Sequence, residues 1–485
     1  MKKATMAVLS LSAVVGGPCF AGSASGAGVS AVQLQSFLDP AGVFQTLDSM
    51  GTGGFDPRSP FFQSLGTNGR SCGTCHLPNQ AFTLSATAAA LTFALTQGRD
   101  PLFAPVDGAN CPNAQPGDAS AHSLLLKNGL FRISLPLPAT AQFTITVVHD
   151  PYGCAITLDP KTGLEDVSVY RRPLPATNLS YLSDVMSDGR ETVAPLSPES
   201  TFLANLQTDL MQQASDATTG HAQALNPPSA AQLTAIVNFE LGTYTAQSLD
   251  WVTGPLTQEG ALGGAMALFA EPYYPGINDA KGKDPTGAPF NPASMTLFTA
   301  WTNLPAGTNP ISVSLETAQA AVAAGENIFN TAVLTTGGGG VTHCATCHDT
   351  PNIGNRSLSA FLDIGTAHST LPSTETNAQI SAALAELSMP DLPVYLINGC
   401  PDTTNPGQIA AFYTTDPGRA LITGQCSDLY HTKVPILRGL ATRAPYFHNG
   451  AAADLSQVVN FYNQRFQMGL TPEQMSELVA FLSSL

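Results

Sequence analysis

Basic residues are scarce in this chain of 485 residues, which has 19 lysines and arginines against 35 aspartates and glutamates and a formal net charge of −16. A surface with this excess of negative charge repels phosphate groups, which disfavours nucleic acid and anionic membrane surfaces as partners. Long apolar runs are lacking as well, because no stretch beyond the N-terminus approaches the about 20 apolar residues that span a bilayer. We therefore expect a protein without a membrane span.

The N-terminus has the pattern of a secretory signal peptide. Two lysines follow Met1, an apolar run extends from Ala7 to Val15, and Cys19–Ala21 forms a cleavage site of the small-x-small type. We expect residues 1–21 to be removed and the mature protein to be exported.

A pentapeptide of the form Cys-x-x-Cys-His occurs twice, at Cys72–His76 and at Cys344–His348. This spacing is the attachment signature of c-type haem, since two thiols add to the two vinyl groups of one porphyrin and the adjacent histidine binds the iron. Dithiol motifs and zinc sites share the two cysteines, but a dithiol needs no histidine and a zinc site needs its cysteine pairs closer together. The sequence therefore predicts two covalent haem c groups, whose attachment outside the cytoplasm favours the periplasm. The predicted haem-binding residues are Cys72, Cys75, His76, Cys344, Cys347 and His348, of which His76 and His348 would bind iron.

Four further cysteines remain once Cys19 has left with the signal peptide. They are Cys111, Cys154, Cys400 and Cys426. An oxidising compartment predicts two disulfides among them. Of the three pairings that four cysteines allow, we favour Cys111 with Cys154 and Cys400 with Cys426, because each pair lies within one expected domain. Four free buried thiols are the alternative.

The fold is expected to be mainly α-helical, with two c-type cytochrome domains and a small β insert in the first. The expected divisions are an N-terminal haem domain at residues 30–250 with the insert near 100–165, a connection at 251–312 and a C-terminal haem domain at 313–485. The connection is rich in Gly, Pro, Asn and Asp, which is typical of irregular structure.

Local patterns place a few elements within these domains. Capping boxes predict helices that begin after Ser229 and after Thr471, and an alanine-rich helix is expected at residues 315–329. The stretch Phe143–Val148 is the best strand candidate, as part of a hairpin within 131–160.

Several stretches beyond the haem motifs point to one family. They are Arg172-Pro173, Met186–Glu191, Leu437–Gly439 and Ala444–Gly450. Together with the two haem motifs they resemble the bacterial dihaem cytochrome c peroxidase and MauG superfamily, from about Val43 to the C-terminus.

The resemblance implies a division of labour between the haems. The haem of His76 would react with peroxide, and the haem of His348 would take in electrons. The implied function is the reduction of hydrogen peroxide to water, with electrons from a small donor protein, either a cytochrome c or a cupredoxin. A homodimer is a further expectation. An acidic surface would suit docking to a basic donor, although plain solubility explains it equally well.

Two residues are candidates for the sixth iron ligand of the second haem. The family places it 14 residues after the histidine of the Pro-Tyr-Phe-His stretch, which from His448 gives Tyr462. The rival is Met468, whose thioether would raise the reduction potential where a tyrosinate would lower it. Tyr462 also falls on the helical face of Leu455 and Val459, so an ordinary core tyrosine is the third alternative.

At the reactive haem the family places a glutamine and, ten residues later, a glutamate. Here Gln213 is followed by Gln223, and an amide cannot move a proton at ordinary pH. His221 could do so, because an imidazole titrates near neutrality. Alternatively, His221 is a sixth ligand that blocks the iron, or a surface histidine; His122 is a second candidate for a distal ligand.

Two further departures from the family concern electron transfer and calcium. Ser187 stands where family members often carry a tryptophan between the haems, so electrons would need another route, such as Tyr181. The family's calcium site would fall on the backbone carbonyls of Arg443 and Pro445. An oxidase like MauG and a dihaem electron carrier without enzymatic activity are therefore kept as alternative functions.

Overall fold

The computed structural model describes residues 33–51, 55–115, 117–158, 163–305, 307–336, 340–372, 391–401 and 409–485. The expected signal peptide, residues 1–21, lies outside the described residues. In the described part of the chain, none of the helices combines the length and the apolar character that a membrane crossing requires.

The expectation of a mainly α-helical fold is wrong. In the described residues, strands accompany the helices and form several sheets. The α-helices of this part of the chain are α1 (Cys72–Cys75), α2 (Ala86–Thr96), α3 (Ser123–Asn128), α4 (Glu199–Gly220), α5 (Ala230–Gly242), α6 (Gly264–Ala270), α7 (Pro310–Thr331), α8 (Cys344–Cys347), α10 (Ala420–Thr423), α11 (Leu455–Arg465) and α12 (Pro472–Ser483).

One antiparallel sheet joins the start of the described chain to the strand that follows α5. Its strand order is β1 (Gln33–Leu38), β2 (Gly42–Asp48), β7 (Thr243–Asp250) and β8 (Gly254–Pro255). The first six residues of β7 are all buried, so the strand lacks the alternation of apolar and polar residues by which a sequence reveals a strand. This burial on both faces explains why the sequence analysis missed the sheet.

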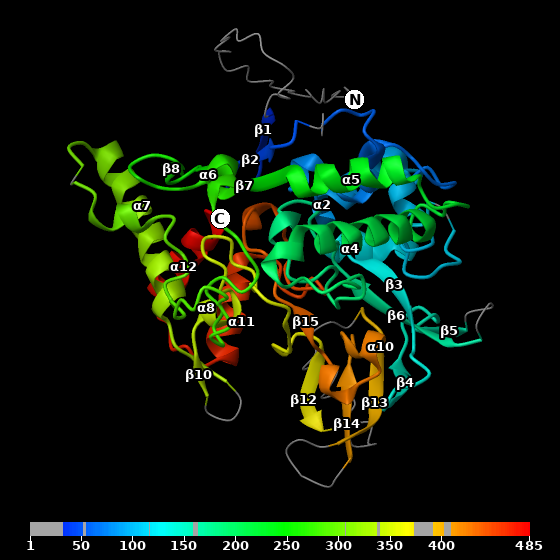
Figure 1. Cartoon of the computed structure of the whole chain (residues 1–485). Coiled ribbons are helices and arrows are strands. Elements are labelled where there is room, and N and C mark those ends of the chain that lie inside the picture. Colours follow the sequence, from blue (N-terminus) through cyan, green and yellow to red (C-terminus); the bar gives the residue numbers. More distant parts are fainter. Residues whose placement is uncertain are drawn as a thin grey trace, which may run out of the picture. The chain divides into compact units, whose positions relative to one another are not determined.

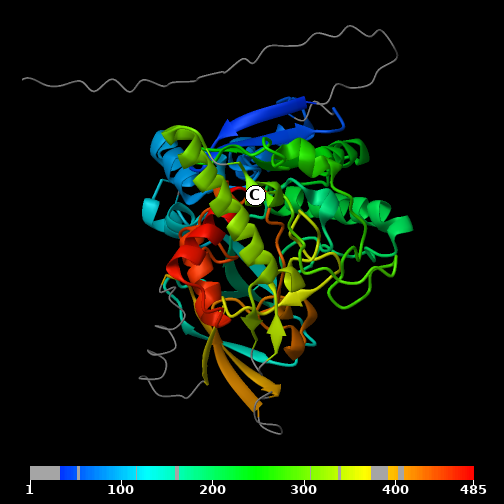
Figure 2. The same cartoon turned by 90° about the vertical axis from the view of Figure 1, so that its left-hand side faces the viewer.

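A second antiparallel sheet brings together distant parts of the sequence. Its order is β12 (His368–Pro372), β14 (Ile409–Thr414), β13 (Val394–Pro401) and β4 (Thr144–His149). The strand predicted at Phe143–Val148 is therefore present as β4, but it pairs with β13 and not within a local hairpin. β12, β13 and β14 extend away from α4, α5, α7 and α12 in both views, and α10 lies beside them (Figures 1 and 2).

The remaining strands form small sheets. β3 (Phe131–Pro136), β6 (Glu165–Arg171) and β5 (Ile156–Leu158) make three strands, and the two-stranded pairs are β9 (Leu334–Thr335) with β10 (Val341–Thr342) and β11 (Phe361–Leu362) with β15 (Thr432–Lys433). Two disulfides are present, Cys111–Cys154 and Cys400–Cys426, the second of which begins in β13. They are consistent with the favoured pairing.

The helices that matter for the site begin where local signals indicate. α5 starts at the capping box of Ser229 and Gln232, and α12 starts at that of Thr471 and Gln474. The expected alanine-rich helix is present as the longer α7. α4 lies beside α5, and α7 lies beside α12, in both views (Figures 1 and 2). α4 and α5 together form one wall of the cavity described below.

Candidate haem sites

The two Cys-x-x-Cys-His motifs fold in the same way. Each forms a single helical turn, α1 or α8, and each histidine N–H donates to the carbonyl of the first cysteine, at 3.0 Å for His76 and 2.9 Å for His348. Thr74 and Thr346 cap the two turns by accepting from the backbone N–H three residues earlier, at 3.0 and 3.2 Å. The same local sequence therefore presents two thiols and one imidazole with the same geometry at both places.

A backbone carbonyl lies at hydrogen-bond distance from the Nδ1 of each motif histidine and orients the ring. The Nδ1 of His76 lies 3.0 Å from the carbonyl oxygen of Phe82, and the Nδ1 of His348 lies 2.5 Å from that of Gly354. A backbone partner at Nδ1 leaves Nε2 free for a metal. Burial lowers the pKa of both rings, to about 4 for His348, so both are neutral at pH 7, which is the form that binds iron.

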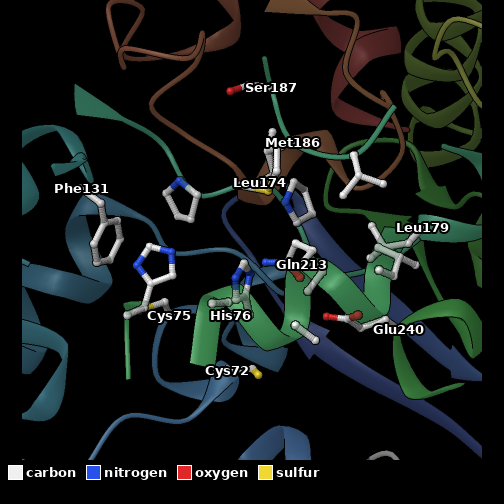
Figure 3. A pocket seen from close by; sticks show the side chains of 18 of the residues that line it. Cys72, Cys75, His76, Phe131, Leu174, Leu179, Met186, Ser187, Gln213 and Glu240 are labelled. Atoms are coloured by element: carbon white, nitrogen blue, oxygen red, sulfur yellow. The ribbon is translucent and has the colours of Figure 1, made fainter. Parts of the chain in front are cut away.

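A cavity opens in front of His76 (Figure 3). Its walls come from the first haem motif, from α4 and α5, and from the segments 171–190 and 433–443. Figure 3 shows Gln213 and Glu240 around the same space as His76, with Cys72 and Cys75 at its edge. The four motif cysteines are outside the two disulfides, so their thiols are available for thioether bonds.

Cationic side chains without a carboxylate partner line this cavity. Arg172, Lys433 and Arg443 take part in none of the ion pairs within the described ranges. Burial lowers the pKa of Arg172 and Arg443 to about 10 and that of Lys433 to about 8. A haem carries two propionates, which would neutralise buried cations. The thiols, the imidazole and these cations therefore fit a haem c.

One face of α4 lines the cavity with two of the predicted residues. Gln213, Ala217 and His221 follow each other at intervals of four, so they lie on one helical face, and all three line the cavity. Gln223 does not belong to this set. α4 ends at Gly220, Gln223 has a φ of +54°, and its exposed side chain accepts from Asn68 at 3.4 Å. The residue ten positions after Gln213 therefore lies outside the cavity lining.

His221 is held by a buried ion pair that the sequence analysis did not find. The Nδ1 of His221 donates to one carboxylate oxygen of Asp107, and Arg70 donates to the other. Arg70 is in turn fixed by the carbonyls of Pro101 and Leu102, at 2.8 and 2.7 Å. Burial would raise the pKa of Asp107, but His221 and Arg70 outweigh burial and hold that pKa below its usual range.

This arrangement fixes which nitrogen of the neutral His221 ring carries the hydrogen. Because an ionised Asp107 can only accept, that hydrogen is on Nδ1, and Nε2 of the neutral ring keeps a free lone pair. His221 is half-exposed and lines the cavity. Its Nε2 is therefore available as a proton acceptor.

Glu240 is a second cavity residue that the sequence analysis missed. It is 5% exposed, it lines the cavity, and its Oε2 has no hydrogen-bond partner. A sequence signal existed, because residue 240 lies four positions after Ile236 and three after Val237, on the apolar face of the predicted helix. An acid on such a face is unusual and marks a buried polar site.

His122 is fully buried at the end of the short helical turn that precedes α3. Its buried ring packs against Phe93 and Phe103, with centroids 5.8 and 5.3 Å away, and its Nδ1 lies 2.7 Å from the carbonyl oxygen of Gly108. It does not belong to the cavity lining. We assign it a structural role.

At the second motif, the surroundings of Tyr462 connect this candidate ligand with the haem cysteines. It lies on α11 and stacks on Phe466 with centroids 5.6 Å apart. Burial raises the pKa of its hydroxyl, and the thiols of Cys347 and Cys344 add to the rise, which places the phenol near the second haem motif. Met468 follows the end of α11, where its N–H donates to the carbonyl of Asn463 at 3.1 Å.

Replacing Tyr462 by phenylalanine tests this placement. The variant should convert the second haem to a five-coordinate or methionine-ligated form, which changes its absorption and electron paramagnetic resonance spectra. The spectrum of the first haem should stay as it is. Identical spectra for both haems in the wild type and in the variant would show that Tyr462 is a core residue only.

Part of the chain is similar in sequence to known proteins. No family model matches the chain. A cytochrome c peroxidase of Denitromonas iodatirespirans is 40% identical over 78 residues, which are 15% of this chain and 21% of the relative. The cytochrome c peroxidase of Escherichia coli is 41% identical over 83 residues, 17% of each chain. The expected resemblance to the dihaem cytochrome c peroxidase and MauG superfamily is confirmed.

These matches cover only a small part of each sequence. The chain matches about a fifth of the length of these curated relatives. The solved structure of a MauG-like protein associated with microbial copper homeostasis aligns over 88% of this chain and 87% of its own, with 12% identity and a TM-score of 0.34. A TM-score this low supports no conclusion about the fold.

The positions that match the superfamily's calcium site do not fit a calcium ion here. The carbonyl oxygen of Arg443 accepts from the Arg172 guanidinium at 2.9 Å, and that of Ala444 lies 3.5 Å from the same group. A cation on these oxygens repels a second one, and calcium needs six to eight oxygen ligands. Pro445 follows directly, and within the described residues no cluster of three acidic, histidine or cysteine side chains could add ligands.

Where the superfamily often has a tryptophan, Ser187 lies within 3.5 Å of Arg171. Tyr181, six residues before Ser187, is buried. Its hydroxyl donates to the Leu268 carbonyl at 2.7 Å, and the centroid of its ring lies 5.5 Å from that of Tyr273. The Tyr181 carbonyl also accepts from Asn355, close to the second motif. A tyrosine route between the motifs stays a prediction.

Proposed function

We propose that this protein is a periplasmic dihaem c-type cytochrome that reduces hydrogen peroxide to water with electrons from a small donor protein. The observation that carries the proposal is the cavity in front of His76, into which one face of α4 brings Gln213 and His221. A protein that only carried electrons would have no use for a proton-accepting imidazole beside an open cavity.

The first haem would be held by Cys72 and Cys75 through thioether bonds and by His76 through its Nε2. Arg172, Lys433 and Arg443 would neutralise its propionates. When bound, the haem supplies the iron that exchanges electrons with peroxide. The second haem, at Cys344, Cys347 and His348, would receive electrons from the donor.

The side chains of α4 would handle the substrate and its protons. The amide of Gln213 can both donate and accept a hydrogen bond, which orients a peroxide molecule. The free Nε2 of His221 can take the proton from one peroxide oxygen as the O–O bond breaks and give it back when that oxygen in turn becomes water. Asp107 stabilises the imidazolium that forms in between, because its carboxylate stays ionised beside Arg70.

One observation favours the alternative of an oxidase that acts like MauG on a protein or organic substrate. The phenol of Tyr462 near the second motif would give that haem a low potential. Such a haem would store an oxidising equivalent better than a methionine-ligated haem.

The proposal is tested by mixing the holoprotein with a reduced small c-type cytochrome and peroxide. Two donor molecules should be oxidised per peroxide consumed, because peroxide takes two electrons. Consumption of peroxide without donor oxidation, but with oxidation of an added phenol or protein, would favour the oxidase. If neither donor nor peroxide is consumed, the protein is an electron carrier.

A further inference from the structure

We propose that Glu240 is a catalytic acid of the His76 cavity, which supplies protons to the oxygen that leaves as water. The inference rests on the proposed peroxide reduction and names a residue that the expected site did not contain. Each turnover breaks one O–O bond and forms two new O–H bonds. Two electrons come from the small redox protein that serves as donor, and two protons come from solvent, the last step of their transfer being from Glu240.

The position of Glu240 is set by its neighbours on α5. Phe239 packs into a group of phenylalanines, with its ring 4.6 Å from that of Phe61 and 5.5 Å from that of Phe82. Val237 and Leu241 are buried in a different core, together with Leu206. With both cores fixed, the side chain of residue 240 can only face the cavity, as Figure 3 shows.

The carboxyl group of Glu240 is buried, and part of its hydrogen-bonding capacity is unused. It is 5% exposed, and its Oε2 has no hydrogen-bond partner in the described part of the molecule. An orphaned carboxyl oxygen is costly in a protein interior and is retained mainly where it has a function. A peroxide oxygen or a water in the cavity would satisfy it.

Burial alone raises the pKa of Glu240 to about 8. The charged and titratable groups that face the same cavity belong to the motif, to the loops before and after it, to α4 and to segment 433–443. They are Arg70, Cys72, Cys75, His76, Asp107, Arg171, Arg172, Arg190, His221, Lys433 and Arg443. Burial is the cause of the raised pKa of Glu240, so the protonated form predominates at pH 7.

The two carboxyl groups of the cavity therefore take opposite forms. Asp107 is ionised beside Arg70 and His221, whereas Glu240 is neutral in an apolar wall. A pair of acids whose environments separate their pKa values is how proteins assign base and acid. His221, with Asp107 behind it, is the base, and Glu240 is the acid.

The test uses the holoprotein of the wild type and of Glu240→Gln, which keeps the volume and removes the proton. The pH-dependent infrared difference spectrum of the wild type should show a protonated carboxyl band that disappears near pH 8 and is absent in the variant. The variant should lower kcat/KM for peroxide about 10²-fold below pH 8, the lower end of the range for an acid catalyst. Wild-type kcat/KM should fall as pH rises through 8, and that of the variant should not.

Glu326→Gln is the matched control, because Glu326 is also buried, has a raised pKa and lies outside the cavity lining. It should leave kcat/KM and its pH profile unchanged. Wild-type kcat/KM in Glu240→Gln, or a carboxyl band that survives in it, would overturn the role of Glu240 while the proposed function stands. A wild type that does not reduce peroxide at all would overturn both.

Discussion

Peroxide turnover is expected to fall about 10²- to 10⁴-fold when His221 is replaced by alanine, the usual loss when a general base is removed. The reason is geometric: Asp107 holds the Nδ1 hydrogen of His221 and leaves Nε2 free at the cavity. The measurement is kcat/KM for peroxide with a reduced donor cytochrome.

Two comparisons make this result interpretable. Gln212→Ala is the control on the same helix, because the Gln212 amide is exposed and donates to Asp216 at 2.9 Å, away from the cavity. Added imidazole should restore part of the rate in His221→Ala. A faster variant would mean that His221 is a blocking iron ligand, and an unchanged rate would remove both roles.

Replacing Asp107 by asparagine is expected to cost about as much as removing His221 itself. Arg70 donates to one oxygen of Asp107, so an asparagine must keep its oxygen toward Arg70 and turn its NH₂ toward His221. The Nδ1 of His221 then has to accept, which moves the ring hydrogen to Nε2 and destroys the proton acceptor. We expect kcat/KM for peroxide to fall about 10²-fold or more.

Asp56→Asn is the control for this variant, because Asp56 also pairs with an arginine, Arg58, but on the surface. It should leave kcat/KM unchanged. Since Asp107 is buried, the thermal unfolding temperature and the absorption spectrum of the haem are measured as well. A stable Asp107→Asn variant with a normal haem spectrum and wild-type turnover would contradict the role of Asp107.

The features that were correct in advance are those with a local cause. Each haem motif consists of five consecutive residues, and both motifs form the same helical turn. α5 and α12 begin at capping boxes, which depend on residues three apart.

The features that the sequence analysis missed depend on distant parts of the chain. β4 was predicted as a strand, but its partner β13 lies about 250 residues away and could not be predicted. β7 is buried on both faces, so its residues do not alternate between apolar and polar. Asp107 meets His221 across 114 residues of sequence. Gln223 was placed in the cavity by the ten-residue interval of the family, but α4 ends at Gly220 and Gln223 is not part of the cavity lining. The division into two haem domains stays a prediction.

The central claim is that the haem of His76 has an open position at which peroxide reacts. The most direct test is the electronic and electron paramagnetic resonance spectrum of the purified holoprotein, fully oxidised and then half reduced, with peroxide added to each. The proposal predicts one high-spin haem in the half-reduced protein whose spectrum changes at once with peroxide. Two haems that remain low-spin and unchanged by peroxide in both states would contradict it and leave an electron carrier.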